Sequence, residues 1–139
     1  MLVVFVDTSA FFALQAEDDK RHAVATQRFQ YLISNKIPLV TTNYAVVETC
    51  ALLQRRLGMI ALQRFLSELL PVVPVVWVNE RLHERALATL LAADRRKLSL
   101  VDCVSFELMR DCGWHQAFAF DAHFDEQGFD CEIPISPAN

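Results

Sequence analysis

Apolar residues follow two patterns along this chain: short unbroken runs, and longer stretches in which they recur every three or four residues. An unbroken apolar run is typical of a strand covered on both faces, whereas the helical spacing indicates a helix with one buried side. The predicted strands are residues 2–6, 39–42, 72–78 and 117–120, with a short edge strand at 133–135. The predicted helices are residues 10–17, 22–34, 44–57, 59–70, 80–93 and 99–112. This alternation predicts an α/β domain with a mostly parallel sheet.

Polar residues mark where several of these helices begin. A side-chain oxygen at such a position accepts a hydrogen bond from a backbone N–H group that has no partner inside the helix. We expect Thr8 or Ser9 to cap the first helix, and Asn43, Asn79 and Ser99 to cap later ones.

Length and composition predict one domain. The chain has 139 residues, of which 53% are hydrophobic, so it is long enough for one sizeable core and too short for two. We therefore expect a single domain over residues 1–139. No apolar run approaches the roughly 20 residues of a membrane-spanning helix, and the start lacks the basic and small-residue features of a signal peptide. We expect a cytoplasmic location without membrane contact.

Four carboxylates lie in sequence that otherwise reads as core. Asp7 and Asp121 directly follow apolar runs, and Glu48 and Asp102 lie within apolar helical segments, with no Lys or Arg within four positions of any of them. Burying an unpaired carboxylate is costly. Because the carboxyl ends of parallel strands meet at one edge of a sheet, we expect these four side chains to converge there.

Converging carboxylates need a compensating charge. Two of them about 5 Å apart repel by roughly 3 kcal/mol at an effective dielectric of about 20. A divalent cation removes that repulsion, and a ligand set made only of oxygen favours Mg²⁺ or Mn²⁺ over Zn²⁺. The pattern therefore predicts phosphate chemistry.

Each acid also has a simpler interpretation. Asp7 is suited to capping a helix, Asp121 to starting a turn, and the Ser99-x-x-Asp102 spacing fits a capping box, in which each residue bonds the backbone N–H of the other. Glu48 has no capping explanation. The prediction therefore depends on all four meeting at one place.

The remaining charges give a mixed picture. The net charge of −4 is unfavourable for binding a phosphate backbone. The basic segment Arg95-Arg96-Lys97 is a candidate contact for such a backbone, although a solvated helix end is the more common role of a cluster of this kind. His123 lies near Asp121, where it could touch the substrate or a carboxylate of the site, although a loop histidine without a role is the favoured interpretation.

Four segments, VDTSAFFAL, TTNYAVVETCALL, LSLVDCVSFELM and AFAFDAHFDEQGF, resemble in order and spacing the PIN-domain family of ribonucleases over essentially the whole chain. The resemblance implies a three-layer α/β/α sandwich. It also implies that one or two Mg²⁺ or Mn²⁺ ions are bound by the quartet of Asp7, Glu48, Asp102 and Asp121. The positions that commonly support this centre correspond to Ser9, Asn43 and Ser99, with Asp125 as a more variable acid.

The resemblance further implies a biological setting. Many short members are VapC-like toxins of toxin–antitoxin pairs, which are dimeric and inhibited by a small antitoxin protein. We therefore expect a metal-dependent endoribonuclease, in which one ion activates a water and a second stabilises the departing 3′ oxygen to leave a 5′-phosphate. Glu48 would bind an ion or orient the water, and Arg95 and Arg96 would steer the RNA.

Other functions remain open at this point. A haloacid-dehalogenase-like or receiver-like phosphoryl transfer domain also places an Asp after its first strand, but the former needs an acid where this chain has Ser9, and we find no match for the late Lys of the latter. A non-catalytic PIN-like binding module would keep the acidic pocket as a docking surface. A non-toxin RNA-processing nuclease would share the chemistry and lack the antitoxin.

Overall fold

The central sheet has four parallel strands. The structure, a computed structural model, describes residues 2–134. Its strands are β1 (Val4–Val6), β2 (Leu39–Thr42), β3 (Val75–Val76) and β4 (Gln116–Phe118), in the spatial order β3-β2-β1-β4. Every neighbouring pair is parallel, which agrees with the mostly parallel sheet predicted from the sequence.

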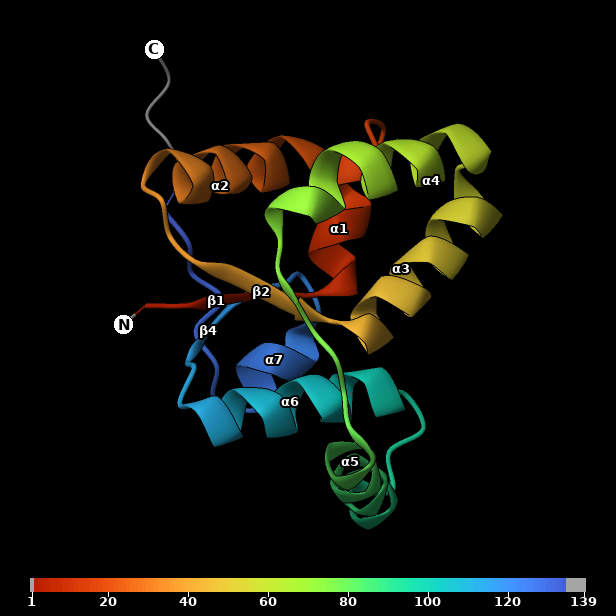
Figure 1. Ribbon diagram of the computed structural model, residues 1–139, viewed down its shortest axis with the longest axis vertical. Coiled ribbons are helices and arrows are strands. Elements are labelled where there is room, and N and C mark those ends of the chain that lie inside the picture. The colour runs from red at the N-terminus through yellow and green to blue at the C-terminus, as the bar shows by residue number, and fades with distance from the viewer. Residues whose placement is uncertain (1, 135–139) are drawn as a thin grey trace.

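Helices cover both faces of this sheet. They are α1 (Thr8–Gln15), α2 (His22–Ser34), α3 (Asn43–Arg56), α4 (Met59–Arg64), α5 (Glu80–Ala93), α6 (Leu100–Cys112) and α7 (Ala122–Glu126). Figure 1 shows the sheet between α1, α2 and α4 on one side and α5, α6 and α7 on the other. The three-layer α/β/α sandwich is therefore confirmed.

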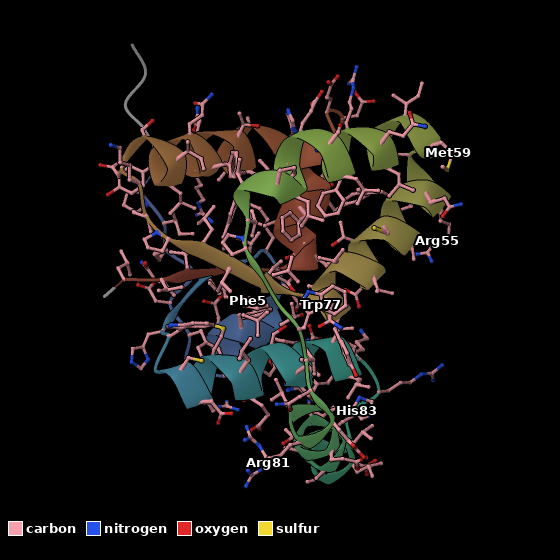
Figure 2. All side chains as sticks on the ribbon, in the orientation of Figure 1. Phe5, Arg55, Met59, Trp77, Arg81 and His83 are labelled. Atoms are coloured by element: carbon pink, nitrogen blue, oxygen red, sulfur yellow. The ribbon has the colours of Figure 1, made fainter. Side chains whose placement is uncertain are left out.

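Strand β1 divides the core into two parts because its side chains alternate between the two faces. Val4 and Val6 pack in the cluster that contains residues of α1 and α2, such as Phe11 and Leu32. Phe5 points the other way, toward the layer of α6 and α7 (Figure 2), and packs in the second cluster, with its ring stacked on Phe124 at a centroid distance of 6.3 Å. All of these side chains are buried, so the strand is held from both sides.

The strand order creates a crevice at one edge of the sheet. The chain leaves β1 to form β2 on one side, and later crosses to the other side of β1 to form β4. Such a change of direction opens a space at the carboxyl ends of the two strands, where ligands of parallel sheets bind. Asp7 follows β1 directly, and its N–H donates to the Phe118 carbonyl at the end of β4 (3.0 Å). The crevice therefore begins at Asp7.

Two predicted helix caps are wrong. The cap of α1 is Asp7, not Thr8 or Ser9, because the helix starts as soon as the strand ends. The cap of α3 is Thr42, whose hydroxyl accepts from the Ala45 N–H (3.0 Å). The predicted caps of α5 and α6, Asn79 and Ser99, are confirmed.

The segment after α4 also differs from the prediction. Residues 59–70 were expected to form one helix, but α4 gives way to a π-helical turn at Phe65–Leu69 and then a 3₁₀ turn at Leu70–Val72. The wider π turn still lets Phe65 and Leu69 reach the core. Burial of these two side chains thus accompanies the change in helical geometry.

The third strand is shorter and more exposed than predicted. The apolar run at 72–78 was interpreted as a buried strand, yet β3 contains only Val75 and Val76, both half-buried. The 3₁₀ turn uses the start of the run, and β3 lies at the edge of the sheet that the described residues form, so it pairs with β2 on one side. The expected edge strand at 133–135 does not form at 133–134, and residue 135 lies outside the described residues.

Candidate active site

Asp7 is a buried carboxylate with a specific partner. It is 3% exposed, and its Oδ2 accepts from both the N–H (3.1 Å) and the hydroxyl (2.7 Å) of Ser9. Burial raises the pKa of Asp7 to about 7; the Ser9 bonds oppose this, and the charges of Asp102 and Glu48 add to it. Asp7 therefore both caps α1 and lies within the electrostatic field of two other acids.

Ser9 connects the two strand ends of the crevice. Besides donating to Asp7, its Oγ accepts from the Phe120 N–H at 2.9 Å. The start of α1 is thereby tied to the segment that carries Asp121. Ser9, which was predicted to support the site, thus links Asp7 to the segment that ends at Asp121.

Asp102 has both of the roles that the sequence left open. Its Oδ2 accepts from the Ser99 N–H (3.2 Å), and the Ser99 hydroxyl accepts from the Asp102 N–H (3.1 Å), which completes a capping box. The residue is 6% exposed, and burial raises the pKa of its carboxyl, as does the charge of Asp121. The capping box thus orients a carboxylate that also faces the other acids.

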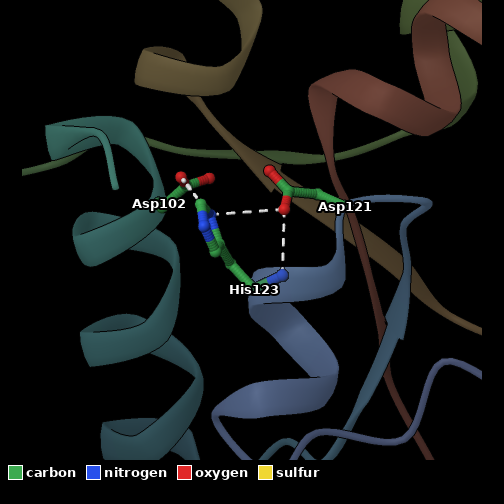
Figure 3. A group of neighbouring side chains, drawn as sticks. All are labelled: Asp102, Asp121 and His123. Carbon is green, nitrogen blue, oxygen red and sulfur yellow. Dashed lines mark hydrogen bonds and ion pairs between the residues drawn. The ribbon is translucent and has the colours of Figure 1, made fainter. Parts of the chain in front are cut away.

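Asp121 and His123 lie at the start of α7, beside Asp102 (Figure 3). Asp121 caps this helix by accepting from the His123 N–H (2.9 Å). The His123 Nδ1 lies 3.3 Å from Asp121 Oδ1 and 3.4 Å from Asp102 Oδ2. One ligand atom from each of the three residues lies within 4.8 Å of the others.

His123 is thus part of the cluster, contrary to the interpretation that favoured a loop histidine without a role. The sequence carries only a weak local signal for this arrangement, the Asp121-x-His123 spacing. Asp121 caps α7 by accepting from the His123 N–H, and the His123 ring lies against the same carboxylate.

Glu48 approaches the same place from α3. It is half-buried, and burial raises the pKa of its carboxyl. The Thr8 hydroxyl opposes this shift, whereas the charges of Asp102 and Asp121 add to it. The expectation that Glu48 converges with the other acids agrees with this environment. Thr8 was not predicted to lie in the site, yet its Oγ also donates to the Ala45 carbonyl of α3 (3.2 Å).

The structure therefore brings all four predicted acids together. They come from the end of β1, from α3, from α6 and from the start of α7. The charges of Glu48, Asp102 and Asp121 each raise the pKa of at least one other acid of the four. Within residues 2–134, no Lys or Arg forms an ion pair with any of them. Carboxylates gathered without a cationic side chain are suited to a divalent metal ion, and their oxygens fit Mg²⁺ or Mn²⁺.

The remaining predicted residues lie around this centre. Asn43 accepts from the Val78 N–H (2.7 Å), which joins the start of α3 to the segment before α5. Asp125 is exposed on α7 and is not a member of the three-residue group. Arg95 and Arg96 are exposed, and Arg95 pairs with Glu126 at 3.0 Å. The structure thus keeps these two cations at the surface.

Comparison with known proteins identifies the family. The sequence profile of the PIN domain matches residues 4–130. The chain belongs to the PIN-domain family.

Individual relatives agree with this assignment. The chain is 40% identical over 129 residues to the 23S rRNA-specific endonuclease VapC20 of Mycobacterium tuberculosis strain H37Rv, which covers 91% of this chain and 95% of the relative. VapC20 from strain CDC 1551 matches equally well. The crystal structure of M. tuberculosis VapC20, described as a sarcin-ricin loop cleaving toxin, superimposes with a TM-score of 0.82 at 38% identity over 94% of this chain and 99% of that chain. The predicted PIN-like fold and the VapC-like resemblance are confirmed.

Proposed function

We propose that this PIN domain is a metal-dependent endoribonuclease that acts as the toxin of a toxin–antitoxin pair. The observation that carries the proposal is the meeting of Asp7, Glu48, Asp102 and Asp121 at the crevice between β1 and β4. The relatives, whose names describe a ribosomal RNA endonuclease and a toxin, support this chemistry and this role.

The acids would hold Mg²⁺ or Mn²⁺. Asp7, Asp102 and Asp121 would bind most directly, and Glu48 would bind an ion or orient the attacking water. A bound ion of this kind lowers the pKa of a coordinated water and stabilises charge on phosphate oxygens. The Ser9 bond to Asp7 and the capping box at Asp102 hold the carboxylates in place before any ion arrives. Hydrolysis would break the P–O3′ bond and leave a 5′-phosphate.

His123 adds a positioning role to this scheme. Its Nδ1 lies within 3.4 Å of carboxylate oxygens of both Asp102 and Asp121. An imidazole N–H in this place donates to one carboxylate and leaves the remaining oxygens for a metal ion. We propose that His123 fixes the rotamers of these two acids.

The RNA backbone would be steered by the basic segment before α6. Arg95 and Arg96 are exposed there, four and three residues before Ser99, the cap of α6. Since the chain carries a net charge of −4, these cations would offset part of the repulsion between RNA and the acidic centre.

The biological setting is also part of the proposal. We infer a small antitoxin as inhibitor, a homodimer and a cytoplasmic location, and the single-domain organisation over residues 1–139 stays a prediction. Within residues 2–134, none of the helices combines the length and apolar content needed to cross a bilayer.

Cleavage of RNA by the purified protein tests the activity. We expect hydrolysis of ribosomal RNA with Mg²⁺ or Mn²⁺, none with EDTA, and none for Asp121→Asn, while Asp111→Asn, at an exposed site on α6, cleaves normally. A protein that binds RNA without cutting it under any of these metal conditions would instead be a binding module. Growth arrest on expression, relieved by a small protein encoded beside it, separates a toxin from a processing nuclease.

A further inference from the structure

An apolar pocket adjoins the acidic centre. It has a volume of about 290 Å³ and is lined by Asn43, Tyr44, Val47, Glu48 and Val101. Glu48 belongs to both the pocket and the quartet. Val101 directly precedes Asp102 in the chain, so the pocket and the carboxylates are adjacent parts of one surface between α3 and α6.

We propose that this pocket binds one nucleobase next to the scissile phosphate of the RNA, and so contributes to the choice of cleavage site. The inference rests on the proposed ribonuclease function. The volume of the pocket lies just below the range of roughly 300–1,000 Å³ for small-molecule sites, which suits a single base better than a larger ligand.

The walls have the character that a base requires. Val47 is 68% exposed, whereas Ala45 and Leu53 on the same helix are buried. The tyrosine ring offers a base a face on which to stack, and the exposed valine beside it offers apolar contact. A phosphate-binding surface would instead present cations, and among the five lining residues there is none.

The aromatic wall is held in place before RNA binds. The Tyr44 hydroxyl is hydrogen-bonded to the His83 Nδ1 of α5, a residue labelled in Figure 2. The two rings meet edge to face, with their centroids 5.8 Å apart. Because the ring position is fixed by another helix, less side-chain freedom is lost when a base packs against it.

One polar group in the pocket can distinguish bases. The Asn43 Oδ1 is occupied by the Val78 N–H. With its oxygen held there, the amide nitrogen is the part of Asn43 that is left to donate to a ligand. A base that presents a ring nitrogen or carbonyl oxygen at this position is favoured over one that presents an amine.

The overall charge gives an independent reason for such a contact. Proteins that bind RNA through phosphates need clustered Lys and Arg, but this chain has a net charge of −4 and an acidic centre where the phosphate must lie. Affinity must therefore come partly from contacts that do not depend on charge. Stacking of a base in the apolar pocket supplies one, and it makes binding less sensitive to salt than phosphate contacts alone.

The test uses an RNA hairpin that carries the mapped cleavage site, together with versions in which one base near the scissile bond is replaced by an abasic ribose. For the wild-type protein, removal of the base at one position should lower kcat/KM by about 10- to 100-fold, as expected for one stacked base. Val47→Ala should itself lower kcat/KM on the intact hairpin and should reduce the further loss caused by the abasic position. Val72→Ala, the same change at another exposed site, should behave as wild type.

The Tyr44 variants separate the ring from its hydrogen bond. Tyr44→Phe keeps the stacking surface, so removal of the base should still lower kcat/KM nearly as much as in the wild-type protein. In Tyr44→Ala, removal of the base should have little further effect. Thermal unfolding of each variant shows whether it is folded. Binding of the hairpin to the Asp121→Asn protein, followed by the fluorescence of 2-aminopurine at the same position, reports the contact without cleavage.

Three results would overturn the base-binding pocket. In the first, the wild-type protein cleaves the hairpin and no abasic position matters, or Val47→Ala leaves the abasic loss unchanged; the pocket proposal then fails while the ribonuclease function stands. In the second, the Val47→Ala protein cleaves RNA with the wild-type pattern and is no longer inhibited by a protein partner, which would show that the pocket binds a protein and not a base. In the third, the wild-type protein cleaves no RNA, and both proposals fail together.

Discussion

The Ser9 hydroxyl lies 2.7 Å from the Asp7 carboxylate and donates a hydrogen bond to it, at the point where β1 passes into α1. The same oxygen accepts from the Phe120 N–H, one residue before Asp121. A single side chain therefore sets the distance between two acids that are more than a hundred residues apart in the chain, and it stabilises the charged form of one of them.

Replacing Ser9 by Ala should weaken both the fold and the activity. The change removes a partner from the buried Asp7 and from the Phe120 N–H, which should lower the free energy of unfolding by about 1–3 kcal/mol. Cleavage should fall as well, because two metal-binding acids lose their common anchor. Urea unfolding and RNA cleavage measure the two effects.

Ser34→Ala provides the matched control, since Ser34 is exposed at the end of α2. It should change neither quantity appreciably. A Ser9→Ala protein with wild-type stability and activity would show that Ser9 does not anchor the site.

The pKa of Asp7 predicts how the stability of the metal-free protein depends on pH. Its folded-state pKa of about 7 lies above the ordinary value of 3.8. Between these two values the folded protein holds a proton that the unfolded chain has released, so the Asp7 contribution falls as pH rises from about 4 to 7 and is constant above. The total change is up to about 4 kcal/mol, on the order of the pKa difference converted to free energy.

Asp7→Asn isolates this contribution. The amide cannot ionise, and its oxygen can still accept from Ser9. The stability of the variant should therefore not show the Asp7 part of the decrease between about pH 4 and 7. In EDTA, it should be more stable than wild type at pH 8 and show a smaller difference at pH 5. Parallel stability curves for the two proteins across this range would contradict a raised Asp7 pKa.

The sequence was most informative where short-range patterns determine the structure. Unbroken apolar runs located β1, β2 and β4 to within a few residues, and the acids that follow β1 and β4 were recognised because strand ends meet at one edge. Convergence of Asp7 with Asp121 needed only the parallel arrangement of the sheet. The fold class and this part of the site were therefore accessible without coordinates.

Other features depend on contacts between distant segments. The apolar run at 72–78 looks like a buried strand, but only two of its residues form β3. Its position at the edge of the sheet, which accounts for the short strand, is not visible in the sequence. Asn43 has the right chemistry for a helix cap, yet its partner is Val78, 35 residues away. His123 carries little local signal, because its importance comes from Asp102 on another helix.

His123 should contribute to catalysis through the acids it contacts. His123→Ala removes the ring that lies against Asp102 and Asp121, and groups that orient metal ligands typically account for 10- to 100-fold in affinity or activity, so we expect cleavage to fall by about that factor. Weaker Mn²⁺ binding, measured by calorimetry, should accompany the loss.

The corresponding control is His115→Ala, which changes an exposed histidine before β4. It should leave cleavage and Mn²⁺ binding as in the wild-type protein. If His123→Ala lowers cleavage while Mn²⁺ affinity and the cleavage optimum in metal concentration stay unchanged, the positioning role is wrong.

Addition of Mn²⁺ to the metal-free protein should raise its melting temperature, because an ion that binds only the folded state stabilises it by about 2.7 kcal/mol at a concentration 100 times its dissociation constant.

Asp102→Asn should abolish cleavage and most of this rise in melting temperature. Without metal, the variant should be at least as stable as wild type: the substitution removes one of several repelling charges, and the amide oxygen can still accept from the Ser99 N–H to preserve the capping box. Differential scanning fluorimetry in EDTA and in Mn²⁺ gives both comparisons. A large drop in the metal-free melting temperature would mean that the negative charge of Asp102 serves the helix cap more than the metal site.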